Sequence, residues 1–153
     1  MARTGCRERT TKETTIAVEI DLDGETIDGV SASTGIPFFD HMLDQLGRHG
    51  GFGLRVSCDG DLAIDAHHTV EDVGIAVGEA FVEALGDKAG VRRFANARVP
   101  LDEALVDVAL DLSGRPYLHH EVDFPGQKIL GDPPFDPQLM EEFWRAFAMA
   151  ARI

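Results

Sequence analysis

The stretch His67-His68-Thr69-Val70-Glu71 opens a helical pattern that organises the first half of the chain. Apolar residues follow at helical spacing from Val70 to Ala84, and Gly86 marks the end of the pattern. The sequence therefore predicts a helix that buries one face and presents the two histidines and the glutamate near its start.

These three polar residues have the spacing of metal ligands. Adjacent side chains on a helix diverge by about 100°, so His67 and His68 can each hold an ion of its own. Glu71 lies four residues after His67 and three after His68, the two spacings that bring side chains together on a helix. The pattern predicts two neighbouring metal ions, whereas the plainer interpretation is an exposed helix start with two ordinary histidines.

Composition limits the class of protein. A chain of 153 residues with 44% hydrophobic content is long enough for a single domain, 1–153. Lys and Arg total 14 against 27 Asp and Glu, and the net charge of −13 argues against nucleic-acid and anionic-membrane partners. No apolar run is long enough to span a bilayer. Cys6 and Cys58 are too few for a disulfide framework, so a reducing cytoplasm is the expected location.

The start of the chain predicts an arm followed by a β-hairpin. Residues 1–12 are expected to be a mobile N-terminal arm, and alternating apolar residues over 16–22, followed by residues 26–33, predict two paired strands. The intervening turn belongs to Asp21-Leu22-Asp23-Gly24, which also resembles the nucleophile motif of haloacid-dehalogenase-type phosphatases. Glu25 replaces the Thr or Val usual in that motif, so a hairpin turn is favoured.

A second helix is predicted from Pro37 to the glycine pair Gly50-Gly51. One of its faces carries a polar stripe made of His41, Gln45, Arg48 and His49. Such a stripe is either a solvated helix face or part of a functional site. A strand over 52–58, a tight turn at Asp59-Gly60 and a partner strand over 61–65 are expected to lead into the motif helix.

The second half repeats the first. Residues 105–112, the turn Ser113-Gly114 and residues 117–124 predict another hairpin, and the helical pattern over 139–149 follows Pro134-Phe135 as the earlier helix begins at Pro37-Phe38. We therefore expect an α+β chain with a first repeat over 13–90 and an incomplete second repeat over 91–153.

Three motifs in order resemble the imidazoleglycerol-phosphate dehydratase family of histidine biosynthesis. They are Gly35-Ile36-Pro37-Phe38-Phe39-Asp40-His41-Met42-Leu43, Asp65-Ala66-His67-His68-Thr69-Val70-Glu71-Asp72 and Asp111-Leu112-Ser113-Gly114-Arg115-Pro116-Tyr117. Shorter matches at Lys12-Glu13-Thr14, Ala84-Leu85-Gly86-Asp87 and Arg92-Arg93-Phe94 extend the resemblance over nearly the whole chain.

The resemblance implies a fold and an activity. The implied fold is a duplicated unit in which each copy is a four-stranded sheet backed by two helices, an arrangement also found in ribosomal protein domains. The implied assembly builds trimers into a 24-subunit shell with active sites between subunits. The implied reaction is the dehydration of imidazoleglycerol phosphate to imidazoleacetol phosphate with two Mn²⁺ ions per complete site and no organic cofactor.

The resemblance also implies roles for individual residues. Metal ligands would be His41, His67, His68 and Glu71. Substrate contacts would come from Glu13, His41, Gln45, His49, His67, His68, Glu71, Arg93 and Arg115. Glu13 is the first candidate for catalytic proton transfer and Glu71 the second, because a carboxylate in contact with substrate can act as a general base.

The resemblance would require a histidine on the third strand of the second half, a second His-His-x-x-Glu motif, and a Ser- and Lys-containing tail that helps to hold phosphate. The 153 residues contain none of these three features. Two hypotheses follow. The protein is a manganese-dependent dehydratase whose remaining ligands lie beyond Ile153, or the chain is a truncated, non-catalytic metal-binding or assembly fragment. The sequence His119-His120-Glu121 is interpreted as an exposed or interface strand, since neighbouring strand residues point to opposite faces.

Overall fold

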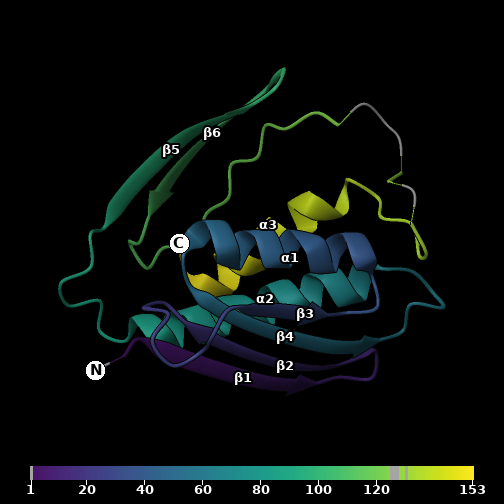
Figure 1. Ribbon diagram of the computed structural model, residues 1–153, viewed down its shortest axis with the longest axis horizontal. Coiled ribbons are helices and arrows are strands. Elements are labelled where there is room, and N and C mark those ends of the chain that lie inside the picture. The colour runs from purple at the N-terminus through teal and green to yellow at the C-terminus, as the bar shows by residue number, and fades with distance from the viewer. Residues whose placement is uncertain (1, 125–127, 130) are drawn as a thin grey trace.

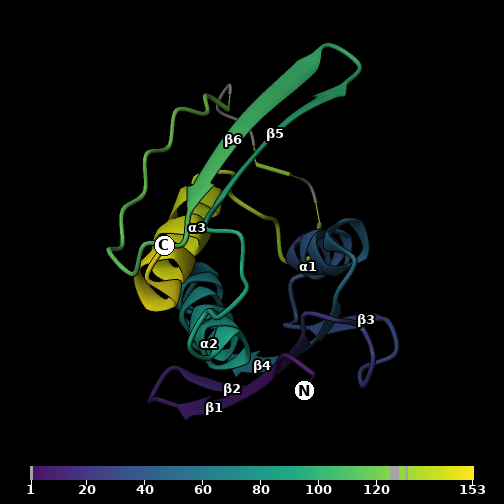
Figure 2. The same cartoon turned by 90° about the vertical axis from the view of Figure 1, so that its left-hand side faces the viewer.

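The structure is a computed structural model that describes residues 2–124, 128–129 and 131–153. Its strands and helices are β1 (Thr4–Thr10), β2 (Thr14–Asp21), β3 (Val30–Ser33), α1 (Pro37–Gly50), β4 (Gly53–Gly60), α2 (His67–Leu85), β5 (Phe94–Leu101), β6 (Ala104–Asp111) and α3 (Leu139–Ala151). A four-stranded sheet forms one layer, and α1 and α2 cover one of its faces (Figure 1). Seen from the side, α3 lies on α2 away from the sheet, and the β5–β6 hairpin projects from the body (Figure 2).

The strand order of the sheet is β1-β2-β4-β3. β2 pairs antiparallel with both β1 and β4, whereas β3 pairs parallel with β4. The α+β class is thereby confirmed, and the second half contributes the β5–β6 sheet and α3. The division of the chain into repeats at residue 90 stays a prediction.

The expected N-terminal arm is wrong because residues 4–10 form an edge strand of the sheet. The hairpin partner of β2 is therefore β1, not residues 26–33. The apolar alternation missed β1 because its inward face carries Gly5, Arg7 and Arg9 in place of apolar residues. A Cβ atom on Gly5 would lie 2.1 Å from the carbonyl oxygen of Ala80, so glycine is what lets the strand approach α2 so closely.

The predicted turn at Asp59-Gly60 and the strand over 61–65 are also wrong. β4 continues to Gly60, and the residues that follow form turns before α2. The first of them still bonds to the sheet's hairpin, because the Asp61 N–H donates to the Glu13 carbonyl oxygen at 3.0 Å. Ile64, whose alternation suggested a strand, is 74% exposed. The alternation of apolar and polar residues over the five positions 61–65 was too short to distinguish a strand from a turn.

In the second half the predicted hairpin is displaced by one strand. The observed pair is β5 with β6, and residues 117–124 form no regular strand or helix. The strand β5 was missed although its apolar residues alternate with Asn96, Arg98 and Pro100, because a proline within such a run is unusual in a strand. The three predicted helices are confirmed, and each begins within a residue or two of its predicted start.

The core lies between the sheet and the helices. Its fully buried side chains include Ile16, Val18, Ile20, Leu43, Leu54, Val56, Val70, Val73 and Val77. The second half joins this core through aromatic contacts, because the Phe39 ring lies 6.2 Å from that of Phe135 and 5.5 Å from that of Phe143. Among the described residues, no helix is long and apolar enough to cross a membrane.

Candidate functional site

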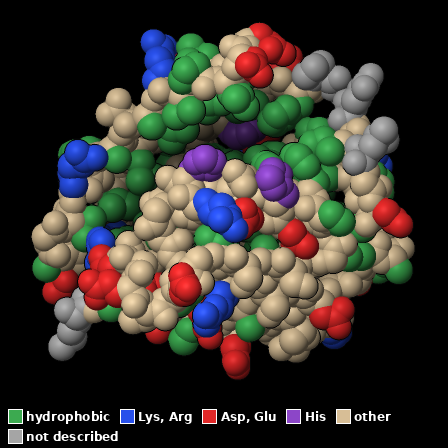
Figure 3. All heavy atoms as spheres, viewed as in Figure 1, with side chains coloured by type: hydrophobic (Ala, Val, Ile, Leu, Met, Phe, Trp, Pro, Cys, Tyr) green, Lys and Arg blue, Asp and Glu red, His purple; other side chains and the backbone are tan. Residues whose placement is uncertain are grey.

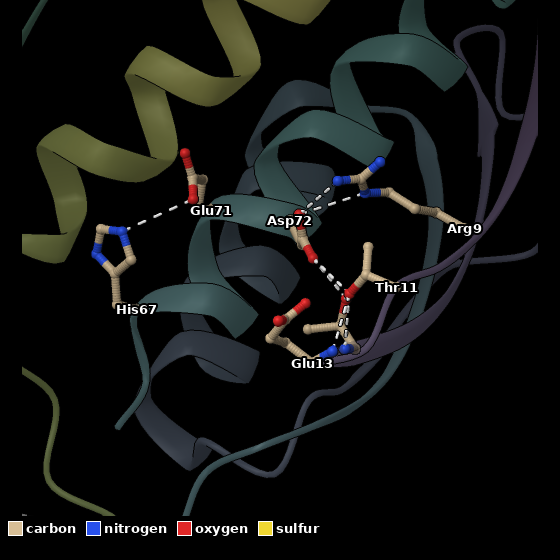
Figure 4. Close-up of polar contacts among 7 residues, drawn as sticks. Arg9, Thr11, Glu13, His67, Glu71 and Asp72 are labelled. Atoms are coloured by element: carbon tan, nitrogen blue, oxygen red, sulfur yellow. Dashed lines mark hydrogen bonds and ion pairs between the residues drawn. The ribbon is translucent and has the colours of Figure 1, made fainter. Parts of the chain in front are cut away.

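The first turn of α2 presents His67 and Glu71 on one side. His67 Nε2 lies 3.7 Å from Glu71 Oε2, and both side chains are nearly half exposed. Figure 4 shows the imidazole and the carboxylate facing each other across one turn. The i,i+4 spacing produces this pairing. A cleft of about 530 Å³ opens beside His67, between the start of α2 and the segment around Lys128 and Glu142.

His68 points elsewhere and has its own carboxylate partner. Its ring centroid lies 6.0 Å from that of His67, with the two planes at 73°. His68 Nδ1 lies 3.0 Å from Asp61 Oδ2, so Nδ1–H can donate to the carboxylate and leave Nε2 available to a ligand. This hydrogen bond, with smaller contributions from the negative charges of Asp61 and Glu13, raises the pKa of His68. The two histidines therefore diverge.

Glu13 lies in the turn between β1 and β2, close to the same end of α2. Its backbone N–H donates to Thr11 Oγ1 at 3.1 Å, and its side chain is exposed. In Figure 4 the Glu13 side chain is directed toward the first turn of α2. The structure thus brings Glu13, His67, His68 and Glu71 to one end of the helix.

The polar stripe of α1 does not join them into one cluster. His41 is exposed, and His49 Nε2 lies 3.0 Å from Gln45 Oε1 on the same helix. Figure 3 shows histidine side chains on the surface over α1. Within the described part of the chain, no three His, Cys, Asp or Glu side chains are close enough to hold a metal ion together. The four predicted ligands consequently do not form one site within a single chain.

Arg93 and Arg115 lie beyond the opposite end of α2. The Arg93 guanidinium donates to both carboxylate oxygens of Asp111, at 2.7 and 3.1 Å, and its Cζ lies 4.7 Å from the centre of the Phe94 ring. This hydrogen bonding, followed by the positive charges of Arg93, Arg115 and Lys88, lowers the pKa of Asp111. The helix of 19 residues separates these cations from His67 by roughly 27 Å, at 1.5 Å per residue.

Sequence reasoning missed two carboxylates near the site, Asp61 and Asp72. Asp61 holds His68, and its Oδ1 is buried without a hydrogen-bond partner among the described residues. Asp72 lies on the buried face of α2 and accepts hydrogen bonds from β1 and β2. A signal for Asp72 was present, because a carboxylate at an otherwise apolar helix position needs partners when it is buried. Asp61 had no comparable signal.

The His119-His120-Glu121 segment lies outside this region and is not a strand. His119 Nε2 lies 3.3 Å from Glu121 Oε1, with both side chains mostly exposed. His120 Nδ1 lies 3.8 Å from Glu141 Oε2 of α3. The two imidazoles thus have separate carboxylate neighbours and form no shared cluster.

Known proteins resemble this chain over almost all of its length. The family model for imidazoleglycerol-phosphate dehydratase matches residues 34–153. The imidazoleglycerol-phosphate dehydratase of Parafrankia sp. (strain EAN1pec) is 56% identical over 100% of this chain and 76% of its own length. That of Gluconacetobacter diazotrophicus is 57% identical over 99% of this chain and 74% of its own length.

Solved structures agree with these sequence matches. The crystal structure of imidazoleglycerol-phosphate dehydratase from Staphylococcus aureus superposes on this chain with a TM-score of 0.82 and is 33% identical in sequence. The match covers 97% of this chain and 79% of the Staphylococcus aureus chain. The enzyme from Pyrococcus furiosus, in complex with (S)-C348, gives a TM-score of 0.78 at 36% identity over 95% of this chain and 74% of that one. The chain therefore belongs to the imidazoleglycerol-phosphate dehydratase family.

Proposed function

We propose that this protein is a cytoplasmic hydro-lyase that dehydrates imidazoleglycerol phosphate to imidazoleacetol phosphate in histidine biosynthesis. The observation that carries the proposal is the combination of family membership with the His67–Glu71 pair at the start of α2. Glu13 and His68 lie at the same end of that helix, so both the candidate ligands and the candidate acid–base group are supplied there.

The residues present suit manganese. Two ligands on one ion at about 2.1 Å are roughly 3 to 4 Å apart, and His67 Nε2 and Glu71 Oε2 are separated by 3.7 Å. Neutral imidazole and carboxylate are both acceptable to Mn²⁺. One chain gathers no third ligand around this pair among the described residues. The proposed site therefore holds two Mn²⁺ ions, whose coordination His41, His68 and donor groups from other subunits would complete. When bound, the ions would stabilise negative charge that develops on the substrate's imidazole ring.

Glu13 is assigned the proton transfer. The reaction expels, as water, the hydroxyl group on the carbon attached to the imidazole ring, and the resulting enol tautomerises to the ketone. The proton that must be removed is the one on the next carbon of the side chain. The exposed Glu13 carboxylate can take up that proton, and Glu71 is the alternative acceptor. Gln45 and His49 on α1 are assigned substrate contacts, and their mutual hydrogen bond fixes the direction of the His49 ring.

The phosphate is assigned to Arg93 and Arg115 of another subunit. A small substrate held at His67 cannot reach these residues in the same chain, because α2 separates them by its whole length. Arg93 retains N–H donors beyond the two that bind Asp111, so it can still bind an anion. This separation supports a site built between subunits of a homo-oligomer. The family resemblance supplies the proposed form of that oligomer, trimers assembled into a 24-subunit particle.

The test is turnover of imidazoleglycerol phosphate by the full-length native protein. We expect product with Mn²⁺, no product after chelation, and recovery when Mn²⁺ is restored. His67→Asn should lower kcat by at least about 100-fold, because it removes a metal ligand, and loss of a residue that only hydrogen-bonds to a ligand already costs about 10- to 100-fold. His119→Asn is the matched control, since His119 also faces a carboxylate but lies outside the site.

Absence of turnover by the full-length protein with Mn²⁺ would overturn the dehydratase proposal. A second candidate function is an assembly or metal-binding fragment without catalysis, which is favoured by the lack of a three-ligand cluster among the residues that the structure describes. That candidate predicts weak Mn²⁺ binding and no turnover for the 153-residue chain under conditions in which the full-length protein is active.

A further inference from the structure

We propose that Asp72 is a positioning residue that holds the catalytic turn, residues 11–14, against α2 and thereby places Glu13 beside the first turn of the helix. The inference rests on the proposed role of Glu13 in proton transfer. It assigns a function to a buried carboxylate that is neither a metal ligand nor a substrate contact in the site described above.

The contacts of Asp72 reach both sides of the catalytic turn. Its Oδ2 accepts a hydrogen bond from Thr14 Oγ1 at 2.5 Å and lies 3.5 Å from Thr11 Oγ1. Its Oδ1 accepts from Arg9 Nη2 at 2.9 Å and from Arg9 Nε at 3.3 Å. Figure 4 shows this carboxylate between the guanidinium and the turn. One side chain of α2 therefore binds the end of β1, the turn and the start of β2.

The turn itself is internally fixed, so its position follows that of its anchors. Thr11 Oγ1 accepts the N–H groups of Glu13 and Thr14, at 3.1 and 3.0 Å. The Glu13 carbonyl oxygen accepts from the Asp61 N–H at 3.0 Å. Because Thr14 directly follows Glu13 and is anchored to Asp72, displacement of Thr14 would move the Glu13 backbone with it.

Burial makes the anchor stiff. Asp72 is 8% exposed and Thr14 is 2% exposed, so water competes little for their hydrogen bond. Arg9 supplies the positive charge that a buried carboxylate requires, with its own side chain partly open to solvent. The Glu13 side chain remains exposed and unconstrained by these bonds. The network therefore fixes the backbone from which Glu13 extends and leaves its carboxylate free to react.

Attachment of β1 to α2 does not depend on Asp72. Arg7 Nε lies 3.0 Å from Glu79 Oε2 two helical turns further along, and Gly5 packs against the backbone of Ala80. The Cys6 N–H also donates to Glu83 Oε2 at 3.4 Å. Asp72 is the contact nearest the catalytic turn, so its loss should shift Glu13 while the strand stays in place. The Arg7–Glu79 pair joins the same two elements and supplies a matched control.

The first experiment compares Asp72→Asn with Glu79→Gln in the full-length protein with Mn²⁺. Asp72→Asn should lower kcat by about 10- to 100-fold, because a displacement near 1 Å can cost that much. The KM and the Mn²⁺ affinity should change by less than about threefold, since the metal and phosphate groups are untouched. Glu79→Gln should leave kcat within about twofold. Equal losses of kcat in both variants would overturn the positioning role.

A rescue series tests the hydroxyl contact. Thr14→Ser keeps the hydrogen bond to Asp72 and should retain most of kcat, whereas Thr14→Val removes it at similar volume and should match Asp72→Asn. Adding Asp72→Asn to Glu13→Gln should cost less than about twofold more, because residues that act through one group are not additive. If Asp72→Asn costs the same factor with and without Glu13, Asp72 does not act through Glu13 and the inference is wrong.

A structural measurement separates this inference from the proposed reaction. Amide hydrogen exchange of residues 11–14 should accelerate in Asp72→Asn and remain unchanged in Glu79→Gln, whether or not the protein turns over substrate. Faster exchange in a protein without dehydratase activity would refute the proposed function and retain Asp72 as the anchor of the turn. Unchanged exchange in Asp72→Asn would overturn the anchor itself.

Discussion

At the scale of single residues, Asp21 shows how a buried carboxylate fixes a chain reversal. It ends β2, is buried, and accepts hydrogen bonds from the Thr26 hydroxyl at 2.7 Å and from the N–H groups of Asp23 and Ile27 at 3.0 and 3.2 Å. The bonds from Thr26, followed by the other backbone N–H groups, lower the pKa of Asp21 well below its ordinary value. The segment that suggested a phosphatase nucleophile is thus a structural turn.

This lowered pKa predicts a pH-dependent contribution to stability. The ionised Asp21 stabilises the fold at pH values above its unfolded pKa of about 3.9, and the contribution is lost as the pH falls toward the folded pKa. Wild type should therefore unfold at a higher temperature than Asp21→Asn at pH 7, and the difference should shrink between about pH 5 and pH 3. Thermal unfolding followed by circular dichroism measures this.

Asp28→Asn is the control, because Asp28 is exposed in the same loop. It should change the unfolding temperature little at any pH in that range. A stability difference between wild type and Asp21→Asn that stays constant from pH 7 to pH 3 would contradict the prediction.

At the scale of elements, α2 is held between the sheet and α3 by a close helix contact. A Cβ atom on Gly74 would lie 2.8 Å from the Phe143 carbonyl oxygen. One on Gly78 would lie 2.8 Å from the Phe147 carbonyl oxygen and 2.9 Å from the Ala151 nitrogen. These are backbone atoms of α3, which side-chain rotation cannot move. Two glycines one turn apart therefore set the distance between α2 and α3.

Gly78→Ala should destabilise the folded protein by about 1–3 kcal/mol, because the added methyl group pushes α3 away from α2. Urea unfolding measures the change. The sign of the change in unfolding free energy is informative, because alanine stabilises an unconstrained helix by about 1 kcal/mol relative to glycine. A peptide spanning residues 67–85 should gain helicity from the same substitution. An increase in the stability of the whole protein would show that the helices are not in close contact.

At the scale of the whole molecule, the β5–β6 hairpin exposes one apolar face. Its register pairs Val99 with Val106 and Ala97 with Val108 on that face, while Arg98 pairs with Asp107 on the other. Val99, Val106 and Val108 are each about half exposed or more. In Figure 3, apolar side chains gather at the upper left, where Figure 1 draws the hairpin. A contiguous apolar sheet face of this kind favours association.

We expect the 153-residue chain to associate in a concentration-dependent manner through this face. Val106→Asp should shift sedimentation toward the monomer, because it places a charge at the centre of the apolar face. Ala109→Asp is the matched control on the opposite face of the same strand. Identical sedimentation of the two variants, or a wild-type chain that stays monomeric at all concentrations, would contradict the prediction.

The sequence by itself determined the helices, the fold class and the residues of the α2 motif. Pro37 and Gly51 delimit α1, and the apolar period that begins at Val70 defines the buried face of α2. These features are local, because turn residues and helical periodicity act over a few neighbouring positions. The family motifs could be recognised from the sequence because each occupies one continuous segment.

The tertiary structure alone decided which strands pair and which polar groups meet. β1 is a strand because it pairs with β2, and its arginines contact Asp72 and Glu79 on α2, residues more than 60 positions away. The same non-local contacts anchor Glu13, attach Asp61 to His68, and separate Arg93 from His67 by the length of a helix. Strand pairing and buried ion pairs depend on partners distant in sequence, and local periodicity carries no information about those partners.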